Sequence, residues 1–285
     1  MTILFPVTTH DVAAGAGISQ ATVSLVLGGN ERARVADATR ARVLRVAEEL
    51  GYRPNILARG LVRGRSYAIG VIVPDLANPF FLEVVAGVQR VAAEAGYAVL
   101  SGDVRETTSK RQLEALRARR IDGIILDGPG AAALPAEALA ELRVVLVDEP
   151  GGRWPAVASD AIAAGRMAAE HLLGLGHRRF AFIGPATAVH GFRMRERGFF
   201  AALRAAGVEL TSERLRRTAP TVSGGLRAMK ALLASGEPPS AVFCANDLLA
   251  LGALKACLSR GVRVPEEISI VGCDDIEMAR VVTPE

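Results

Sequence analysis

The sequence predicts two kinds of structure in one chain: a small all-α helix-turn-helix headpiece and an α/β core of two doubly wound parallel-sheet subdomains. Residues 1–50 contain only helical patterns, whereas apolar runs typical of strands alternate with helical runs from Tyr67 onward. These units are too many for one small sheet, and the stretch PGGRWPAVASD divides them into two series. We therefore place the headpiece at 1–52, a linker at 53–66 and the core at 67–285, with subdomains at about 67–158 and 159–285.

Composition favours a folded protein of the cytoplasm. The 285 residues are 50% hydrophobic and 22% charged, which suits well-filled globular cores rather than disorder. No apolar run approaches the roughly 20 residues of a membrane helix, and the start MTILFPVTTHD lacks the regions of a secretion signal. The three cysteines, an odd number without CxxC spacing, indicate buried reduced thiols: Cys244, Cys257 and Cys273.

Positive charge is concentrated in the N-terminal part of the chain. Residues 1–64 carry eight arginines and five carboxylates, so they hold +3 of the total net charge of +4. A basic module on a nearly neutral body is typical of a nucleic-acid-binding headpiece. A solvated basic face without a partner gives the same pattern, so charge alone does not decide between the two.

Three short helices are predicted in the headpiece. Thr8 has Asp11 three residues later, which predicts a capping box at the start of the first helix. Ser19 is the natural N-cap of a second helix through about Leu27, which the glycines that follow bring to an end. Apolar residues at i, i+3, i+4 and i+7 predict a third helix over about 37–50. A tight turn between the first two helices indicates a helix-turn-helix bundle.

The segment YRPNILARGLVRGRS is predicted to be a linker that switches between coil and helix. Pro54 ends the preceding helical pattern, and Asn55 is able to cap a brief helix through Leu61. Gly60 weakens such a helix by up to about 1 kcal/mol relative to alanine.

The core is predicted to alternate strands and helices. Strands are expected at AIGVIVP, AVLSG, GIILD, VVLVDE, AVASD, RFAFIG, AVFCAND and ISIVGCDD, and helices at 81–95, 110–119, 135–142, 161–174, 193–206, 223–234 and 248–260. Continuous apolar strands separated by helices favour parallel sheets covered on both faces. Polar residues stand at the strand exits, namely Asp75, Asp127, Asp148, Asp160, Asn246 and Asp274. Since ligands of such sheets bind beyond the carboxyl ends of the strands, this set predicts a polar cleft.

Patterns typical of enzymes are missing from the sequence. It contains no GxxxxGK[ST], no GxSxG, and no GxGxxG that opens a helix after a strand. The four histidines, His10, His171, His177 and His190, lie apart without the spacing of metal ligands. Asp274 and Asp275 are sequence neighbours whose side chains point different ways, so they are a poor acid/base pair. We therefore expect a binding protein without a catalytic site, metal or cofactor.

Several motifs in order resemble the lactose-repressor/galactose-repressor family of bacterial transcription regulators along the whole chain. They are TTHDVAAGAGISQATVSLVL in the headpiece, ELGYRPNILARGL at the third helix and linker, and IGVIVPDLANPFF, HLLGLGHRRFAFIG, VFCANDLLALGAL and VPEEISIVGCDD in the core. The resemblance implies a core like a periplasmic sugar-binding protein, whose small-molecule effector alters how a homodimer sits on operator DNA. It also implies a cytoplasmic, nucleoid-associated location.

The resemblance assigns DNA-contacting positions to the headpiece and linker. They are Thr8, His10, Ser19, Gln20, Ala21, Thr22, Ser24, Leu25, Tyr52, Asn55, Ala58 and Leu61. Gln20, Ala21 and Leu25 match positions that face bases, and Leu61 matches a leucine that wedges into the minor groove. The alternative role for Leu61 is packing against the linker of the partner. Leu25 offers a base only apolar contact, so it predicts a preference for T·A at that position.

The resemblance assigns effector contacts to the core. They are Asp75, Phe80, Asp148, Arg195, Asn246 and Asp274. Phe80 matches a stacking position, and arginine with aspartate and asparagine suits bidentate hydrogen bonding to a sugar or another small polar ligand. Pro220 stands where relatives often have an aromatic residue.

The chain departs from the family pattern in three places. Gly28 replaces the usual asparagine, and GGNERAR is longer than usual. Ala36 replaces the serine that caps the third helix, so we expect Asp37 to take the cap. Relatives continue beyond VVTPE with a further strand and helix, so we expect a core that stops there to be less stable.

Two other classes of protein compete with the regulator. A solute-binding protein without DNA function would share the core, but it does not account for the basic headpiece. An enzyme on a doubly wound fold lacks a catalytic constellation. The leading hypothesis is an effector-responsive DNA-binding regulator that acts as a repressor, with induction and co-repression both open.

Overall fold

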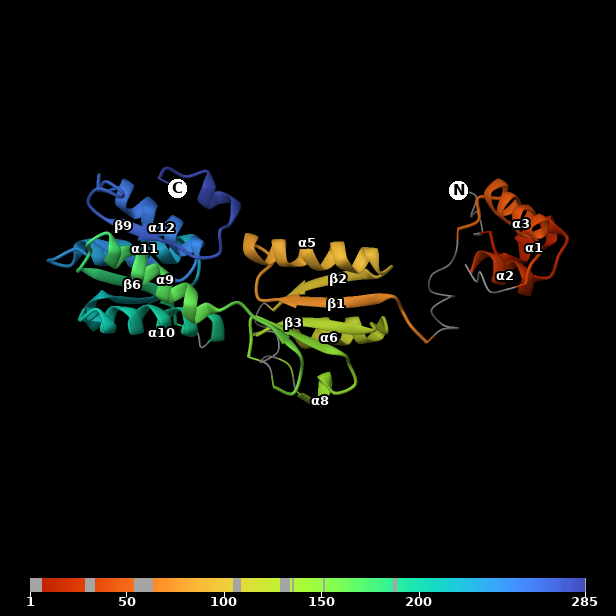
Figure 1. The fold of residues 1–285 in the computed structure, drawn as a ribbon, viewed down its shortest axis with the longest axis horizontal. Coiled ribbons are helices and arrows are strands. Elements are labelled where there is room, and N and C mark those ends of the chain that lie inside the picture. The colour runs from red at the N-terminus through yellow and green to blue at the C-terminus, as the bar shows by residue number, and fades with distance from the viewer. Residues whose placement is uncertain are drawn as a thin grey trace. The chain divides into compact units, whose positions relative to one another are not determined.

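Two compact units, Met1–Ser66 and Tyr67–Glu285, make up the chain (Figure 1). The structure is a computed structural model that describes residues 7–28, 34–53, 64–104, 109–128, 134, 136–150, 152–186 and 189–284. None of the helices in these ranges is long and apolar enough to span a membrane.

The headpiece contains the three expected helices, α1 (Thr9–Ala16), α2 (Gln20–Leu27) and α3 (Asp37–Glu49). The capping box of α1 is present, because Thr8 N–H donates to Asp11 Oδ2 at 2.8 Å and Asp11 N–H donates to Thr8 Oγ1 at 3.4 Å. Gly17 ends α1 in the left-handed conformation at φ 64°, which turns the chain toward α2.

A small apolar core joins the three helices. Val12, Val23 and Val43, one from each helix, are fully buried. Gly15 lies where α1 meets α3, because a Cβ there would stand 2.9 Å from Val46 Cγ1. Helix α2 packs on this core through Val23 and Val26.

The start of α3 corrects one expectation. Ala36 is the N-cap residue and supplies no side-chain hydrogen bond, while Asp37 lies inside the first turn. The aspartate therefore does not cap the helix. Instead its carboxylate lies near the positive end of the helix dipole, where a negative charge is favourable.

The first sheet of the core has five parallel strands in the order β2-β1-β3-β4-β5. They are β1 (Ala68–Val73), β2 (Ala98–Asp103), β3 (Gly123–Asp127), β4 (Val144–Val147) and β5 (Ala156–Val157). Helix α5 (Pro79–Glu94) connects β1 to β2, and α6 (Ser109–Ala118) connects β2 back to β3 on the other side of β1. Right-handed connections that run in opposite directions place their helices on opposite faces of the sheet, as Figure 1 shows. A short α8 (Ala136–Leu139) precedes β4.

The second sheet has four parallel strands in the order β7-β6-β8-β9. They are β6 (Phe180–Pro185), β7 (Leu215–Thr218), β8 (Ala241–Cys244) and β9 (Ser269–Val271). Its helices are α9 (Ala161–Gly174), α10 (His190–Ala205), α11 (Val222–Ala234) and α12 (Asp247–Leu258), with 3₁₀ turns at Ser212–Arg214 and Glu277–Arg280. The two parallel sheets confirm the predicted α/β core.

Strand β7 has no counterpart among the expected strands. Its sequence LRRT contains one apolar residue, because β7 is an edge strand that pairs only with β6. The continuous apolar pattern used to find strands requires burial on both faces, and β7 does not have it. The expected helix over 135–142 is also shorter in the structure, at Ala136–Leu139.

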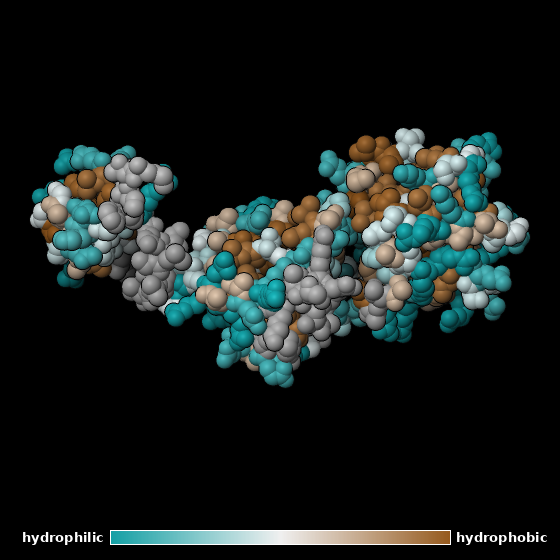
Figure 2. Space-filling model, turned by 180° about the vertical axis from the view of Figure 1, so that it is seen from behind, coloured by the Kyte–Doolittle hydropathy of each residue, from teal (hydrophilic) through white to brown (hydrophobic). Residues whose placement is uncertain are grey.

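Each sheet has its own buried core. In the core around the second sheet, Phe180, Phe182 and Phe243 of the strands and Phe199 of α10 are almost completely buried. Other apolar residues stay at the surface, among them Leu258 at 59%, Met278 at 48% and Val281 at 76% exposure. Figure 2 shows apolar side chains gathered on the surface of this lobe.

Candidate functional site

The second helix of the headpiece has one buried and one exposed face. Val23 and Val26 pack on the other helices, whereas Ala21, Ser24 and Leu25 are exposed, with Leu25 at 42%. Ser19 begins the helix by accepting a hydrogen bond from Thr22 N–H at 3.2 Å, and the two hydroxyls lie 2.9 Å apart. Helix α2 therefore presents short polar groups and the apolar side chains of Ala21 and Leu25 to solvent.

Gln20, at the start of α2, is held by the neighbouring helix. Its Nε2 donates to Thr9 Oγ1 at 2.8 Å. Thr8 and His10 are exposed at the start of α1. The sequence motif predicts that these groups share one surface, but it does not predict the Gln20–Thr9 bond, which links residues 11 positions apart.

The remaining expected DNA contacts lie at the end of the headpiece and beyond it. Tyr52 is half-buried and packs against the headpiece core. Asn55, Ala58 and Leu61 lie outside the described residues, as does the brief helix expected there.

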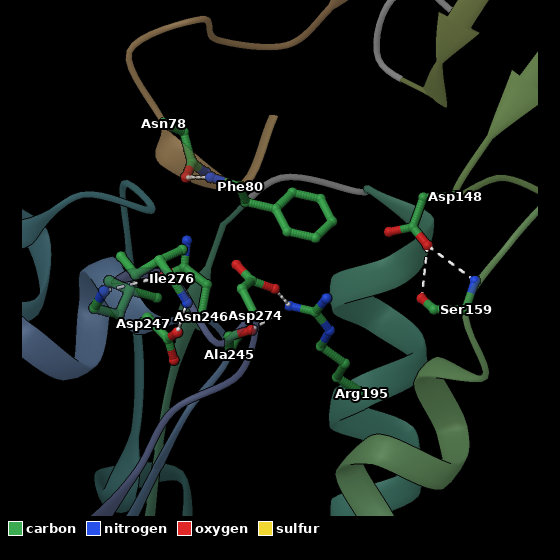
Figure 3. Close-up of polar contacts among 11 residues, drawn as sticks. Asn78, Phe80, Asp148, Ser159, Arg195, Ala245, Asn246, Asp247, Asp274 and Ile276 are labelled. Carbon is green, nitrogen blue, oxygen red and sulfur yellow. Dashed lines mark hydrogen bonds and ion pairs between the residues drawn. The ribbon is translucent and has the colours of Figure 1, made fainter. Parts of the chain in front are cut away.

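In the core, a polar cluster stands at the carboxyl ends of the strands of the second sheet (Figure 3). Arg195 of α10 is 7% exposed, and its guanidinium contacts Asp274 Oδ1 at 2.8 Å. The same Nη1 donates to the Ala245 carbonyl at 2.7 Å. We call Arg195, Asp274 and Asn246 the Arg195 cluster.

Asn246 directs an unpaired donor into this cluster. Its Oδ1 caps α12 by accepting from Leu249 N–H at 3.0 Å. Its Nδ2 is buried and has no hydrogen-bond partner in the described part of the chain, and the same is true of Arg195 Nε. Buried donors without partners are rare in folded proteins, so a ligand with acceptor oxygens would satisfy them.

Close helix packing positions Arg195. A Cβ at Gly165 of α9 would lie 1.8 Å from the carbonyl oxygen of Arg195, and one at Gly198 of α10 would lie 2.0 Å from that of Ile162. The two glycines let the backbones of α9 and α10 touch. Because Arg195 lies at this crossing, any separation of the helices moves its guanidinium.

Two carboxylates support the cluster from neighbouring elements. Asp148 follows β4 with φ 57°, and its Oδ1 accepts from Ser159 Oγ at 2.7 Å. A Cβ at Gly191 of α10 would lie 2.8 Å from Asp148 Oδ2, so α10 comes close to this carboxylate. Asp247 was not expected as a site residue, yet its Oδ2 accepts from Ile276 N–H at 3.0 Å and holds the loop that carries Asp274.

The first sheet contributes an aromatic ring at the same place. Asn78 caps α5 by accepting from Phe80 N–H at 3.1 Å. Figure 3 shows the ring of Phe80 on the side of the Arg195–Asp274 pair. Asp75 accepts from Ala77 N–H at 2.9 Å within the same loop.

One other predicted strand-exit residue and one histidine have structural roles. Asp160 caps α9 through Ala163 N–H at 2.9 Å. His177 lies 3.0 Å from both Ser240 Oγ and Ser269 Oγ, so its ring links the starts of two strands.

Burial raises the pKa values of two carboxyls at the strand ends. Burial raises the pKa of Asp274 to about 7 against the opposing effect of Arg195, and Asp247 and Asp148 add repulsion. Asp127 ends β3, and burial with repulsion from Asp148 and Glu149 raises its pKa to about 7. Burial opposes the charge of Arg195, but Asp274 holds the pKa of the guanidinium above its ordinary value.

These groups can bind a ligand, and no group of three or more metal-ligating side chains exists within the described ranges. A guanidinium donates paired hydrogen bonds, carboxylates accept from hydroxyls, and a phenyl ring stacks on an apolar ring face. The arrangement suits a small molecule with several hydroxyl groups.

Comparison with known proteins matches both parts of the chain. Residues 8–55 match the family described as bacterial regulatory proteins, lacI family. Residues 66–282 match the periplasmic binding proteins and sugar binding domain of the LacI family. The transcriptional repressor CytR of Escherichia coli K12 is 35% identical, over 97% of this chain and 82% of its own. The repressor PurR of Erwinia tasmaniensis is 33% identical, over 97% of this chain and 83% of its own.

Solved structures show the same fold. The lac repressor dimer bound to operator and the anti-inducer ONPF aligns with a TM-score of 0.84 at 30% identity, over 96% of this chain and 84% of the other. The regulator CelR in complex with cellobiose aligns with a TM-score of 0.68 at 33% identity, over 98% of this chain and 86% of the other. From these matches, which span the headpiece and the core alike, the chain belongs to the lacI family of bacterial regulatory proteins.

Proposed function

We propose that this protein is a repressor that reads operator DNA with α2 and changes its DNA affinity when a small polar ligand binds at the Arg195 cluster. The proposal extends the family's activity to particular residues of this chain. The observation that carries it is the buried Arg195–Asp274 pair with unpaired donors beside it. Such donors are costly in an empty site and useful in an occupied one.

The exposed face of α2 supports its role in the major groove. Gln20 is the residue able to make two hydrogen bonds to a base edge, and Ala21 and Leu25 offer apolar contact to a thymine methyl group. The hydroxyls of Thr8, Ser19, Thr22 and Ser24, with His10, surround these side chains and contact phosphates, which set register without reading sequence.

The lac repressor structure supports a homodimer on operator DNA, because its description names a dimer bound to operator. Two copies of α2 then read two half-sites of a pseudo-palindrome. A regulator of this kind works at the nucleoid. The linker 53–66 joins each headpiece to its core, and Asn55, Ala58 and Leu61 contact DNA in this arrangement.

A sugar or sugar derivative is the ligand we propose. Complexes of two relatives, CelR with cellobiose and a regulator from Enterococcus faecium with ribose, support this class. Arg195, Asp274, Asn246 and Asp148 bind hydroxyls, Phe80 stacks on the ring, and Asp75 shapes the loop that carries Phe80. The ligand acts by binding one arrangement of the protein more tightly than the other.

Operator footprinting with Arg195→Ala tests the proposal. We expect the variant to lose its response to the ligand while its operator affinity stays within a few-fold of the original, because Arg195 lies in the core and far along the chain from α2. The ligand is first found by a thermal-shift screen with sugars and nucleobases, in which a ligand at about 100 times its Kd stabilises by about 2.7 kcal/mol.

Arg204→Ala is the matched control, because Arg204 is an exposed arginine in the last turn of the same helix. It should keep both ligand response and DNA binding. Absence of any protected pseudo-palindrome at moderate salt would contradict the regulator itself. Loss of DNA binding and ligand response together in Arg195→Ala would show that Arg195 is a structural residue.

A further inference from the structure

A polar cavity of about 480 Å³ lies on the lobe of the second sheet, beside α10 and the ends of β6 and β7. Arg195, Asn246 and Asp274 do not line it. Among the residues that do line it are three arginines, one glutamate and two phenylalanines: Arg193, Arg197, Arg217, Glu196, Phe192 and Phe200. Positive charge therefore exceeds negative charge on its wall.

Arg217 is fixed at one side of this cavity. Its Nη2 donates to the Glu196 carboxylate, its Nη1 donates to the Pro185 carbonyl at 3.5 Å, and its guanidinium carbon lies 5.8 Å from the centre of the Phe182 ring. Gly184 leaves room for this packing, because a Cβ there would lie 2.4 Å from the Phe182 ring. Glu196 is thus already engaged with one of the three arginines.

Arg193 and Arg197 remain without a partner. They stand four positions apart on α10, both are exposed, and neither side chain makes an ion pair or hydrogen bond within the described residues. Like charges at this spacing face each other on a helix and repel. An anion between them would turn this repulsion into attraction, and arginine binds phosphate oxygens with paired hydrogen bonds.

Aromatic rings stand next to these cations. Phe192 and Phe200 are half-buried and line the same cavity. Their rings give an apolar surface to whatever carries the anionic group. The combination favours an organic anion over a bare inorganic one.

We propose that this cavity binds the phosphate monoester group of a small organic molecule. Arg193 and Arg197 bind the phosphate, Arg217 adds positive charge, and the two phenylalanines contact the organic part. The cavity adjoins the Arg195 cluster, because the Arg195 guanidinium carbon lies 5.7 Å from the centre of the Phe192 ring. Its anion-binding arginines, Arg193 and Arg197, are not residues of that cluster, so phosphate binding is tested independently of the sugar site.

Calorimetric titration of the full chain tests this site. The probes are inorganic phosphate and phenyl phosphate, at an ionic strength held constant with sodium chloride. We expect phenyl phosphate to bind several-fold more tightly, and the double variant Arg193→Gln/Arg197→Gln to weaken binding of both probes by at least about tenfold. Arg204→Gln, on the same helix but outside the cavity, should bind as the original does.

A variant that should tighten binding distinguishes an effect of charge from a loss of folding. Glu196→Gln keeps an acceptor oxygen for Arg217 and removes the one negative charge of the wall, so it should tighten phosphate binding. Equal affinity in the original chain and the double variant would overturn the proposal. Weaker binding in Glu196→Gln would overturn it too, and equal affinity for the two probes would reject the organic ester in favour of free phosphate.

Discussion

At the scale of single residues, the exposure of Leu25 leaves its side chain free to contact DNA instead of packing in the headpiece core. Its side chain is 42% exposed on a helix whose two valines, Val23 and Val26, are buried. An exposed leucine between polar neighbours is able to reach a thymine methyl group but not a hydrogen-bonding base edge. We therefore expect operators selected by this protein to carry T·A opposite Leu25.

Replacing Leu25 with arginine should change this preference. Arginine makes bidentate contacts with guanine, so Leu25→Arg should shift the selected base pair toward G·C, with about 1–3 kcal/mol of discrimination. Selection from a random DNA library measures the shift. Leu44→Arg is the control, because Leu44 is 51% exposed on α3. This substitution adds the same charge elsewhere in the headpiece. An unchanged profile in Leu25→Arg would mean that the residue never reaches a base.

Asp127 makes a prediction about pH. Its pKa is raised to about 7 by burial and by the negative charges of Asp148 and Glu149. A carboxyl whose pKa is higher in the folded than in the unfolded chain costs stability as pH rises from about 4 to about 7. Asp127→Asn should therefore stabilise the core more at pH 8 than at pH 5, by about 3 kcal/mol.

Urea unfolding at the two pH values measures this difference. Glu114→Gln serves as a control, because Glu114 is an exposed carboxylate on α6. An equal gain in unfolding free energy at both pH values would show that ionising Asp127 costs no stability in the folded protein. The raised pKa of Asp127 would then be wrong.

At the scale of elements, the helix crossings of the second lobe carry the site. Gly165 and Gly198 bring α9 and α10 together, and Gly225 and Gly252 do the same for α11 and α12, where a Cβ would lie about as close to the facing carbonyl. Both pairs act in the same way: glycine lets two helix backbones touch. The close contact between α9 and α10 therefore sets the position of Arg195.

Gly165→Ala should therefore disturb ligand binding from a distance. The added methyl group would force α9 and α10 apart, which costs about 1–3 kcal/mol and moves Arg195. We expect weaker binding of the screened ligand and a lower free energy of unfolding. Gly174 lies on the same helix and has open space where a Cβ would stand. Gly174→Ala should therefore neither weaken ligand binding nor lower the free energy of unfolding. Unaltered ligand binding in Gly165→Ala would show that the contact between α9 and α10 does not determine the position of Arg195.

The elements also show how far sequence reasoning reaches. Thr8 and Ser19 were predicted as caps and are caps, since capping depends on residues three positions apart. Arg195 was expected in the cleft through family resemblance, and Asp274 through that resemblance and its place at a strand exit. Their contact was not predicted, because 79 positions separate the partners and no local pattern joins them. Strand β7 and the role of Asp247 were not predicted. An edge strand carries little apolar signal, and a loop-supporting carboxylate resembles any helix-start aspartate.

At the scale of the whole molecule, the two units have separate cores. The buried residues of the headpiece come from α1, α2 and α3, and those of the second unit come from its two sheets and their helices. Units without a shared core unfold independently, and a bundle as small as the headpiece is only marginally stable. We expect at least two unfolding transitions, of which the headpiece gives the smallest enthalpy.

Ligand should shift one of these transitions and leave the other in place. Scanning calorimetry with the screened ligand at about 100 times its Kd should raise core stability by about 2.7 kcal/mol without moving the headpiece transition. Operator DNA should do the reverse and stabilise the headpiece. A single transition that both ligands shift equally would contradict the independence of the two units.

The bond between Gln20 and Thr9 has a consequence for the reading of DNA. The Gln20 side chain already donates one hydrogen bond within the headpiece when no DNA is bound. In the proposed complex, we expect Gln20 to exchange this bond for two bonds to a base edge, so that the preferred base brings a net gain of one hydrogen bond. We therefore expect Gln20 to discriminate between bases less strongly than a glutamine without such a partner would.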